Sequence, residues 1–221
     1  MKNLSVILLA GGLGSRFGAS LPKQFLPLQG QVIASYSLNL FLTFSQIQEI
    51  IIVCDPAYRH LFQHPLIKFA DPGKERQDSV WNGASLASAH AERLIIHDSA
   101  RPFLTKALME NLLQEAENNL AIASAVPVKA TIKQTNLEGF VEKTLNRSSL
   151  WEMHTPQIIE LSLYKKAALF AKSQNLVLTD DVALVELLGH PVKLIPGSYN
   201  NIKITTPEDL HLAETLLHAH V

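Results

Sequence analysis

The sequence predicts a doubly wound α/β fold with a mostly parallel central sheet, and three observations support this prediction. First, short runs of branched apolar residues recur at 4–10, 49–55, 66–70, 93–98 and 120–128. Second, stretches with the spacing of amphipathic helices lie between these runs. Third, the runs are nearly continuous in apolar residues, as strands buried on both faces of a parallel sheet require.

The helices are predicted from apolar side chains that share one face of each segment. One stripe comprises Val32, Ile33, Tyr36, Leu40 and Phe41, and another comprises Leu108, Leu112, Leu113 and Ala116. Two further helices are expected, one near 161–174 and one from about 180 to Leu188, where Gly189 ends the pattern. A strand is expected to follow at 192–195.

A last helix has a clear predicted start. Thr206 is suited to cap it, and Pro207 suits the first helical position because its missing N–H is not needed there. Asp209 stands where a reciprocal capping carboxylate belongs. These three residues together predict a helix that begins at Pro207.

Residues 129–147 break the α/β pattern, because they are polar, alternate in hydropathy and centre on a turn-forming segment at 136–139. They are predicted to form a hairpin arm. Since a two-stranded hairpin alone is marginal in water, we expect the arm to pack on a partner subunit and so form a homodimer. An ordinary surface hairpin is the alternative. The expected organisation is one domain, 1–221, with 129–147 as a dimerisation arm.

The composition is that of an ordinary globular protein, with 47% hydrophobic and 18% charged residues. The net charge of −1 gives no overall field that would attract nucleic acid or an anionic membrane. The one cysteine, Cys54, cannot form an internal disulfide. No segment approaches the ~18 apolar residues of a membrane span. The apolar run after Lys2 is too short for a signal peptide, so a cytoplasmic location is expected.

The most informative segment is a glycine loop at 8–24, LLAGGLGSRFGASLPKQ, directly after the first predicted strand. Ligands of open α/β sheets bind beyond the carboxyl ends of the strands. Because Gly11, Gly12 and Gly14 lack Cβ atoms, the backbone can turn sharply and bring several N–H groups against phosphate oxygens. The loop is therefore predicted to hold phosphates.

Spacing separates the kinds of phosphate loop. A dinucleotide fingerprint that starts at Gly12 needs glycine at position 17, where Phe17 stands, and Gly18 comes one residue late. A P-loop needs Gly-Lys followed by Ser or Thr, which this loop lacks. The loop offers instead two cations, the forked Arg16 and the compact Lys23, which suit transfer of a phosphate-linked group. A tight turn with two solvated cations is the alternative.

Several motifs resemble a known family. The run LLAGGLGSRFGASLPKQFLPLQGQVI resembles the opening of nucleotidyltransferases that act on sugar phosphates. Five later segments resemble, in the right order and over nearly the whole chain, the 2-C-methyl-D-erythritol 4-phosphate cytidylyltransferase family. They are PGKERQDSV (72–80), HDSARPF (97–103), LWEMHTPQ (150–157), TDD (179–181) and NNIKITTPEDL (200–210). The resemblance implies a Rossmann-like nucleotidyltransferase fold. It also implies transfer of CMP from CTP to methylerythritol phosphate, with release of pyrophosphate, in the non-mevalonate isoprenoid pathway.

The resemblance also implies roles for individual residues. The implied catalytic cations are Arg16, Lys23, Arg147 and Lys203, the first two at the triphosphate and the last two at the incoming phosphate. The implied nucleotide-binding residues are Ala10, Gly11, Gly12, Gly14, Gly73 and Ser79. The implied substrate-binding residues are Asp98, Arg101, Thr131 and Thr155, with the threonine hydroxyls as phosphate donors. Mg²⁺, held mainly by the CTP phosphates rather than by protein ligands, is the implied cofactor.

Some alternatives stay open at this point. A structural Asp98–Arg101 pair is the alternative to a substrate-binding Asp98, and a ribitol 5-phosphate cytidylyltransferase shares the loop, the arm and the Thr-Pro-Gln segment. A non-catalytic nucleotide-binding module would lack the four cations, which are present. A hydrolase triad of His97, Asp98 and Ser99 is excluded, because neighbours on a strand point to opposite faces.

The sequence departs from the family pattern at three positions. Ala130 precedes Thr131 where Asp is usual, Lys74 stands where an acid is common, and Ser99 replaces an alanine. None of these positions is one of the four implied catalytic cations, so we expect activity to be retained. The histidines other than His97 show no metal-ligand spacing, so no structural zinc is expected.

Overall fold

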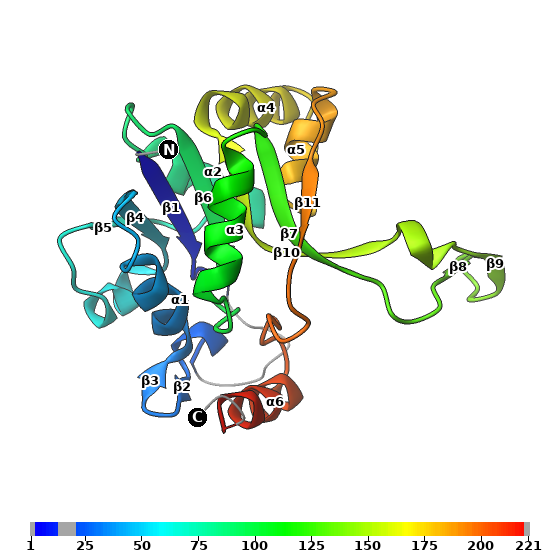
Figure 1. The fold of residues 1–221 in the computed structure, drawn as a ribbon, viewed down its shortest axis with the longest axis horizontal. Coiled ribbons are helices and arrows are strands. Elements are labelled where there is room, and N and C mark those ends of the chain that lie inside the picture. Colours follow the sequence, from blue (N-terminus) through cyan, green and yellow to red (C-terminus); the bar gives the residue numbers. More distant parts are fainter. Residues whose placement is uncertain (1–2, 13–20, 219–221) are drawn as a thin grey trace.

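The computed structural model describes residues 3–12 and 21–218, and in them the predicted doubly wound α/β fold is confirmed (Figure 1). The strands of the main sheet are β1 Leu4–Leu9, β4 Ile47–Val53, β5 Ile67–Ala70, β6 Arg93–Asp98, β7 Ala121–Pro127, β10 Trp151–Glu160 and β11 Lys193–Pro196. Their order across the sheet is β11-β7-β10-β6-β1-β4-β5. Within this sheet β10 alone runs antiparallel to its neighbours, and all other pairs whose direction is recorded are parallel.

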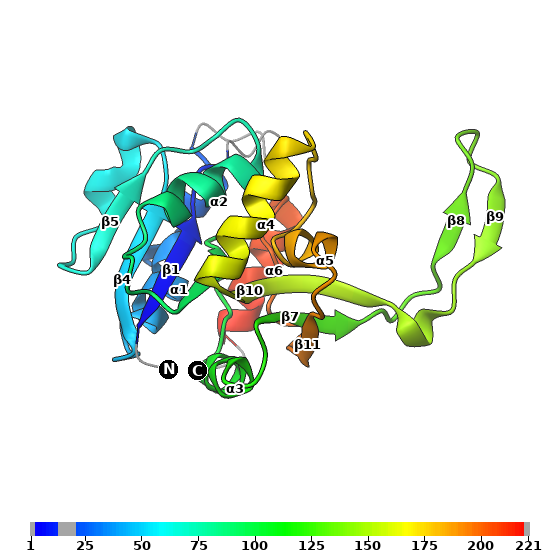
Figure 2. The same cartoon turned by 90° about the horizontal axis from the view of Figure 1, so that it is seen from above.

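Helices cover both faces of the sheet, as Figure 2 shows from above. One face carries α1 Ile33–Phe41 and α3 Lys106–Ala116, and the other carries α2 Arg76–Ser85, α4 Leu161–Ser173 and α5 Val182–Leu187. Strand β1 shows the consequence for the sequence. Val6 and Leu8 belong to the first core, Ile7 between them belongs to the second, and all three are fully buried. A strand with two buried faces has no position that faces solvent, which explains its nearly continuous apolar run.

A third, smaller core lies at the carboxyl-terminal helix, α6 Pro207–His218. This helix packs with the short antiparallel pair β2 Pro27–Leu28 and β3 Gln31–Val32. Its predicted start is confirmed, since Thr206 Oγ1 accepts a hydrogen bond from the Asp209 N–H and Asp209 Oδ2 accepts one from the Thr206 N–H. The segment just before α6 carries Lys203, so this third core fixes the path of that cation.

Strand β10, like helix α2, is an element that the sequence analysis did not predict. It lies between β6 and β7, and it takes in the Thr-Pro-Gln motif that was assigned only to substrate binding. Its middle carries buried polar side chains, those of His154, Thr155 and Gln157. These polar side chains interrupt the run of apolar residues from which a central strand is predicted. They lie against the carboxyl end of β6.

Residues 129–147 leave the sheet between β7 and β10 and project away from the body of the molecule (Figures 1 and 2). The predicted hairpin is confirmed, because β8 Lys133–Thr135 and β9 Val141–Thr144 pair antiparallel. The apolar side chains of the hairpin are exposed to solvent, with Leu137 at 108% and Phe140 at 68% relative exposure. Packing of the arm on a partner stays a prediction. Among the helices of the described ranges, none has the length and apolar character needed to span a membrane.

Candidate active site

A cleft of about 380 Å³ lies at the carboxyl ends of β1 and β6, where open α/β sheets bind their ligands. It brings together predicted site residues that are far apart in the sequence, namely Gly11, Gly12, Lys23, Gly73, Ser79, Asp98 and Lys203. Ala10 lies directly behind it and is buried. Gly14 and Arg16 lie outside the described residues.

The first wall of the cleft is the start of the glycine loop. A Cβ atom at Gly11 would lie 2.6 Å from Pro72 Cβ, so the close approach of the two segments requires glycine. Gln24 then fixes the loop from behind, because its buried Nε2 donates to the carbonyl oxygens of Ala10 at 2.7 Å and Gly12 at 3.0 Å. This places Lys23, the neighbour of Gln24, on the cleft wall.

The second wall is the turn that begins α2. A Cβ atom at Gly73 would lie 2.3 Å from Asp78 Cβ and 2.9 Å from the Ser79 backbone nitrogen, so this position also requires glycine. The Gly73 N–H donates to Ser79 Oγ at 2.9 Å, and Ser79 Oγ lies 3.3 Å from the Glu75 carbonyl oxygen, to which it donates. The Ser79 hydroxyl therefore holds the wall in shape, and its neighbours line the cleft with backbone groups.

Asp98 is the centre of the charged network in the cleft. It is 7% exposed, and its two oxygens contact Lys203 Nζ at 2.7 Å and Arg76 Nε at 3.3 Å. Burial opposes the charge of this carboxylate, but Arg76 and Lys203 outweigh burial and hold the pKa of Asp98 well below its usual range. Asp98 is therefore ionised at neutral pH, and it holds Lys203 at the edge of the cleft.

Arg76 joins this network to a second buried carboxylate. Its Nη1 and Nη2 donate to the two oxygens of Asp181 at 2.9 and 2.8 Å, a forked ion pair. Burial opposes the charge of Arg76, but the attraction of Asp181 and Asp98 prevails and raises its pKa. Arg76 is therefore a permanent cation that links α2, the end of β6 and the residue before α5.

The structure pairs Asp98 with Arg76 and Lys203 rather than with Arg101, so the structural Asp98–Arg101 pair considered from the sequence is corrected. The buried Arg101 guanidinium donates instead to the carbonyl oxygens of Asn201 at 2.7 Å and Met153 at 3.4 Å. Its backbone N–H donates to the Asp98 carbonyl oxygen at 3.0 Å, which closes a tight turn. The guanidinium is thereby turned toward β10 and away from the carboxylate.

A second cavity, of about 230 Å³, adjoins the cleft through shared lining residues. Its lining comprises Arg76, Asp98, Arg101, Met153, His154, Thr155, Gln157, Thr179, Asp180 and Lys203. Three of these, Arg76, Asp98 and Lys203, also line the cleft. The predicted substrate-binding residues Asp98, Arg101 and Thr155 thus meet at one cavity, with cations on its walls. Two connected cavities suit a reaction between two anionic substrates.

Thr131 and Arg147 are the predicted site residues that the structure does not bring to the cleft of their own chain. Both are exposed on the arm, and Arg147 Nη1 donates to the Lys129 carbonyl oxygen at 2.8 Å. Neither residue lines the cleft or the second cavity, and Figure 2 shows β8 and β9 far out from the body of the chain. Their assignment to a site therefore depends on a second subunit.

Arg76, Gln157 and Asp181 are among the polar residues of the site that received no role from the sequence. Arg76 and Asp181 are 105 positions apart, so no local pattern links them. Gln157 Oε1 accepts from the N–H groups of Asp181 and Val182, at 3.0 and 3.1 Å, and so caps α5. The sequence signal that could have found these residues is that they lie inside the family motifs 72–80, 150–157 and 179–181.

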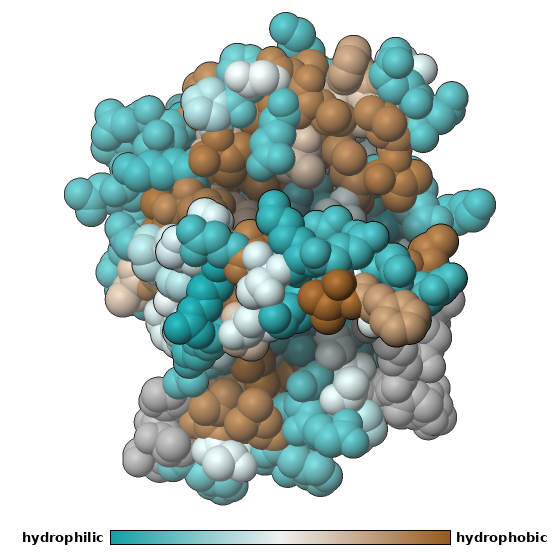
Figure 3. All heavy atoms as spheres, turned by 90° about the vertical axis from the view of Figure 1, so that its right-hand side faces the viewer, coloured by the Kyte–Doolittle hydropathy of each residue, from teal (hydrophilic) through white to brown (hydrophobic). Residues whose placement is uncertain are grey.

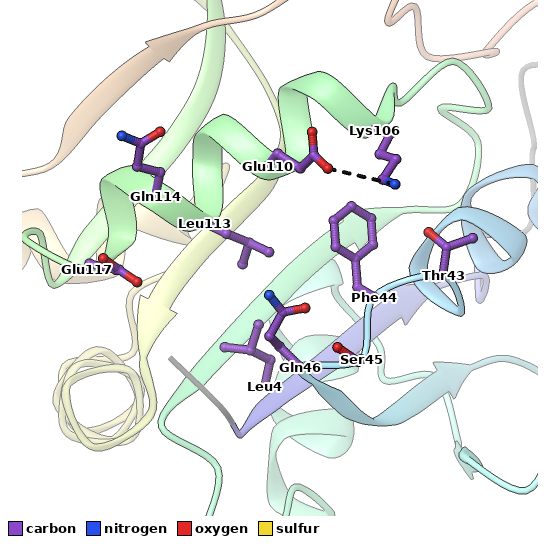
Figure 4. A pocket seen from close by; sticks show the side chains of 10 residues that line it. All are labelled: Leu4, Thr43, Phe44, Ser45, Gln46, Lys106, Glu110, Leu113, Gln114 and Glu117. Carbon is purple, nitrogen blue, oxygen red and sulfur yellow. Dashed lines mark ion pairs between the residues drawn. The ribbon is translucent and has the colours of Figure 1, made fainter.

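A cavity of about 350 Å³ lies at the opposite edge of the sheet, near the start of β1 (Figure 4). Residues of α3 and of the segment 43–46 line it. Its Lys106 points toward Glu110, and the two form an ion pair at 3.8 Å. This cavity lacks converging cations and lies at the amino ends of the strands, so we do not assign substrates to it.

Comparison with known proteins gives one consistent result. The family model described as "IspD: 2-C-methyl-D-erythritol 4-phosphate cytidylyltransferase" matches residues 4–219. A chloroplastic enzyme of that name from Oryza sativa subsp. japonica is 47% identical, over 98% of this chain and 75% of the relative. The enzyme of that name from Chlamydia pneumoniae is 43% identical, over 98% of this chain and 100% of the relative.

Solved structures give the same result. The crystal structure of 4-diphosphocytidyl-2C-methyl-D-erythritolsynthase from Anaerococcus prevotii aligns with a TM-score of 0.87 at 26% identity, over 98% of this chain and 99% of that one. That of Francisella tularensis 2-C-methyl-D-erythritol 4-phosphate cytidylyltransferase aligns with a TM-score of 0.85 at 29% identity, over 96% and 99%.

Proposed function

The chain belongs to the 2-C-methyl-D-erythritol 4-phosphate cytidylyltransferase family, and from this premise we propose that it transfers CMP from CTP to 2-C-methyl-D-erythritol 4-phosphate. The products are 4-diphosphocytidyl-2-C-methyl-D-erythritol and pyrophosphate, in the non-mevalonate isoprenoid precursor pathway. The observation that carries the proposal is the convergence of the glycine loop, Lys23 and Lys203 on one cleft at the carboxyl edge of the sheet.

The reaction needs cations more than it needs a base. A phosphate monoester has a second pKa near 6, so at neutral pH the acceptor is already a dianion and can attack without losing a proton to the protein. An acceptor oxygen forms a bond to the α-phosphorus of CTP, and the bond from that phosphorus to the pyrophosphate oxygen breaks. The protein therefore contributes mainly by positioning two anions and by offsetting their charge.

Individual residues are proposed to divide this task between the two cavities. Backbone N–H groups near Gly11 and Gly12, together with Lys23 and Arg16, hold the triphosphate and the departing pyrophosphate. Lys203 lies on the wall of both cavities and is proposed to hold the incoming phosphate. Asp98, which contacts Lys203 at 2.7 Å, keeps that cation at the junction.

Mg²⁺ is the cofactor proposed for the triphosphate, where it would offset the negative charge of the phosphates. The carboxylates of the cleft, which could act as metal ligands, fit an ion that is held mainly by the nucleotide. Of the carboxylates that line the cleft, Glu75 lies at the start of α2 and Asp98 already contacts two cations. The protein would thus leave most of the coordination sphere to the oxygens of CTP.

We also propose that the protein is a homodimer in which the arm of each subunit reaches the other. The exposed Leu137, Phe140 and Val141 are apolar and gathered on one hairpin, which supports a buried location in an assembly. Figure 3 views the face from which the arm projects, and hydrophobic patches lie around it. Thr131 and Arg147 would then complete the second cavity of the partner, which we call the acceptor cavity because Lys203 on its wall is proposed to hold the incoming phosphate. A cytoplasmic location is proposed as well, supported by the buried thiol of Cys54.

The experiment that tests the proposed function measures pyrophosphate release with CTP and Mg²⁺, and with either methylerythritol phosphate or ribitol 5-phosphate as the acceptor. Turnover is expected with methylerythritol phosphate. Lys23→Ala should reduce kcat by at least about a hundredfold, the usual scale for loss of a group that stabilises the transition state. Lys106→Ala removes the same charge from the opposite edge of the sheet and should not change turnover.

Two results would contradict the proposal. Turnover only with ribitol 5-phosphate would leave the proposed role of Lys23 unchanged and would show that ribitol 5-phosphate is the acceptor instead of methylerythritol phosphate. No pyrophosphate release with either acceptor would refute the acceptor assignment.

A further inference from the structure

A buried histidine lies directly behind the cleft and has no part in the mechanism described above. His97 is the last residue of β6 before Asp98 and is fully buried. Its ring meets that of Phe41 edge to face, with the ring centres 5.5 Å apart. Both of its ring nitrogens have hydrogen-bonding partners, Arg101 and Thr155, which are residues of the acceptor cavity.

The partners determine where the protons lie. Nε2 of His97 is 3.2 Å from the Arg101 carbonyl oxygen, and a carbonyl can only accept, so Nε2 must carry the proton. Burial lowers the pKa of His97 to about 4, so the ring is neutral and its Nδ1 is an acceptor. Thr155 Oγ1 lies 3.1 Å from Nδ1 and therefore donates its hydroxyl proton to it.

The same threonine oxygen accepts a hydrogen bond from the Asp98 backbone N–H at 3.0 Å. One continuous path results, from the Asp98 N–H through Thr155 and His97 to the Arg101 carbonyl. The path begins and ends on the tight turn that Asp98 and Arg101 form. The residue at its start carries the carboxylate that contacts both Arg76 and Lys203.

We propose that His97 and Thr155 are positioning residues that hold the Asp98–Arg101 turn, and through Asp98 set Lys203 for the acceptor phosphate. This inference rests on the proposed function. It also assigns a different role to Thr155 from the one that the family resemblance implied, because its only hydroxyl proton is committed to His97 and none remains for a phosphate oxygen.

Loss of either side chain breaks the path at a buried place. Without the Thr155 hydroxyl, the Asp98 N–H loses its acceptor in a residue that is 7% exposed, so the turn must move to satisfy it. Without an acceptor at the Nδ1 position, the Thr155 hydroxyl must rotate to find another one. Either change displaces the Asp98 carboxylate and with it Lys203, which lines the acceptor cavity.

The test compares Thr155→Val, Thr155→Ser, His97→Gln and the double variant, with both KM values, kcat and the melting temperature measured for each. Glutamine keeps a donor near the Nε2 position and removes the acceptor that Thr155 uses. Thr155→Val and His97→Gln should each raise the KM for the acceptor about tenfold, the scale of one buried hydrogen bond, and leave the KM for CTP within about twofold. Thr155→Ser keeps the hydroxyl and should behave like the wild type.

The double variant distinguishes a shared path from two separate roles. If the two residues act through one path, the double variant should also show about a tenfold rise, whereas independent roles would multiply to about a hundredfold. The control is Phe41→Leu, which removes the ring contact and leaves both hydrogen bonds of His97. It should lower the melting temperature and leave both KM values unchanged.

The result that would overturn the inference is a raised acceptor KM in Thr155→Val with an unchanged one in His97→Gln, since Thr155 would then act on the substrate directly. Long-range ¹H–¹⁵N spectra of ¹⁵N-histidine-labelled protein give a readout that does not depend on turnover. They should show His97 neutral and protonated on Nε2, and a ring protonated on Nδ1 would also refute the inference. An inactive wild type with the expected His97 spectrum would refute the proposed function and not the hydrogen-bond path.

Discussion

The charged groups Arg76, Asp98, Asp181 and Lys203 of the site are paired with one another in a defined set of contacts. Asp98 is paired with Arg76 and Lys203, and Arg76 is paired in turn with Asp181. Removing one partner of a buried pair leaves the other charge desolvated, which typically costs about 3–5 kcal/mol. His97, by contrast, is buried in the neutral form and makes both of its hydrogen bonds in that form. Its charge state therefore links folding to pH.

The predicted pH dependence follows from two buried histidines, His97 and His154. Burial lowers the pKa of each to about 4, below the ordinary value of 6.5. As the pH falls through 6.5, the unfolded chain binds protons that the folded protein does not, so the free energy of unfolding decreases until the pH reaches about 4. For His97 the loss between pH 7 and pH 5 should be about 2 kcal/mol.

Urea unfolding at the two pH values measures this loss. His97→Gln should remove its part of the pH-dependent decrease, and His154→Gln should remove a further part. The exposed His60 gives the control, because His60→Gln should leave the decrease unchanged. An equal decrease in the wild type and in His97→Gln would show that the ring of His97 is not buried in the neutral form.

At the scale of elements, the cleft is formed where strand ends turn into loops and helices. Gly11 and Gly73 permit close approach of backbone segments, whereas at Gly12 no atom of the described residues lies within 4 Å of the place that a Cβ would occupy. Glycines of one cleft therefore serve different purposes. Gly73 is required by the packing of α2, and Gly12 lies on the cleft wall, where no other part of residues 3–12 and 21–218 fills the place of a Cβ.

This difference predicts different effects of the same substitution. Gly73→Ala places a Cβ against backbone atoms that cannot rotate away, so it should cost about 1–3 kcal/mol and lower the melting temperature by several degrees. Gly12→Ala should leave the melting temperature unchanged and reduce the stabilisation that CTP confers, because the added methyl group occupies the cleft. Thermal denaturation with and without CTP measures both effects. A Gly73→Ala protein that melts like the wild type would contradict the packing argument.

At the scale of the whole molecule, the arm is the feature that a single chain does not explain. Its strands carry no core of their own, and Arg147 and Thr131 lie outside the cavities of their own chain. If each arm completes the site of the partner, then every active site contains Lys23 of one subunit and Arg147 of the other. That arrangement makes a specific prediction for mixed dimers.

Lys23→Ala and Arg147→Ala homodimers should both be nearly inactive. A dimer of one Lys23→Ala chain and one Arg147→Ala chain has both defects in one site and none in the other. Co-expression of the two chains should therefore restore about a quarter of wild-type turnover, since half of randomly formed dimers are mixed and each has one intact site of two. Absence of restored turnover in isolated mixed dimers would show that Arg147 acts within its own chain.

Much of the fold could be read from local pattern. The parallel strands, helices α1, α3, α4 and α5, the hairpin at 129–147 and the start of α6 depend on periodicity or on neighbouring residues, and each lies close to where it was predicted. Helix α2 was not predicted. Strand β10 was missed, because buried polar residues and Pro156 interrupt its apolar pattern. The buried state of Thr155 and Gln157 depends on partners from β6 and from the start of α5, which periodicity does not reveal.

The sequence by itself therefore determined the fold class, the place of the glycine loop after the first strand and the family, because each is encoded in short segments of consecutive residues. The pairings within the site were decided only by the tertiary structure. Arg76 meets Asp181 across 105 positions, Lys203 meets Asp98 across the same separation, and Thr155 meets His97 across 58. Contacts of this kind exist only once the sheet has brought distant strand ends to one edge, and their geometry decides which proton or charge each side chain can offer.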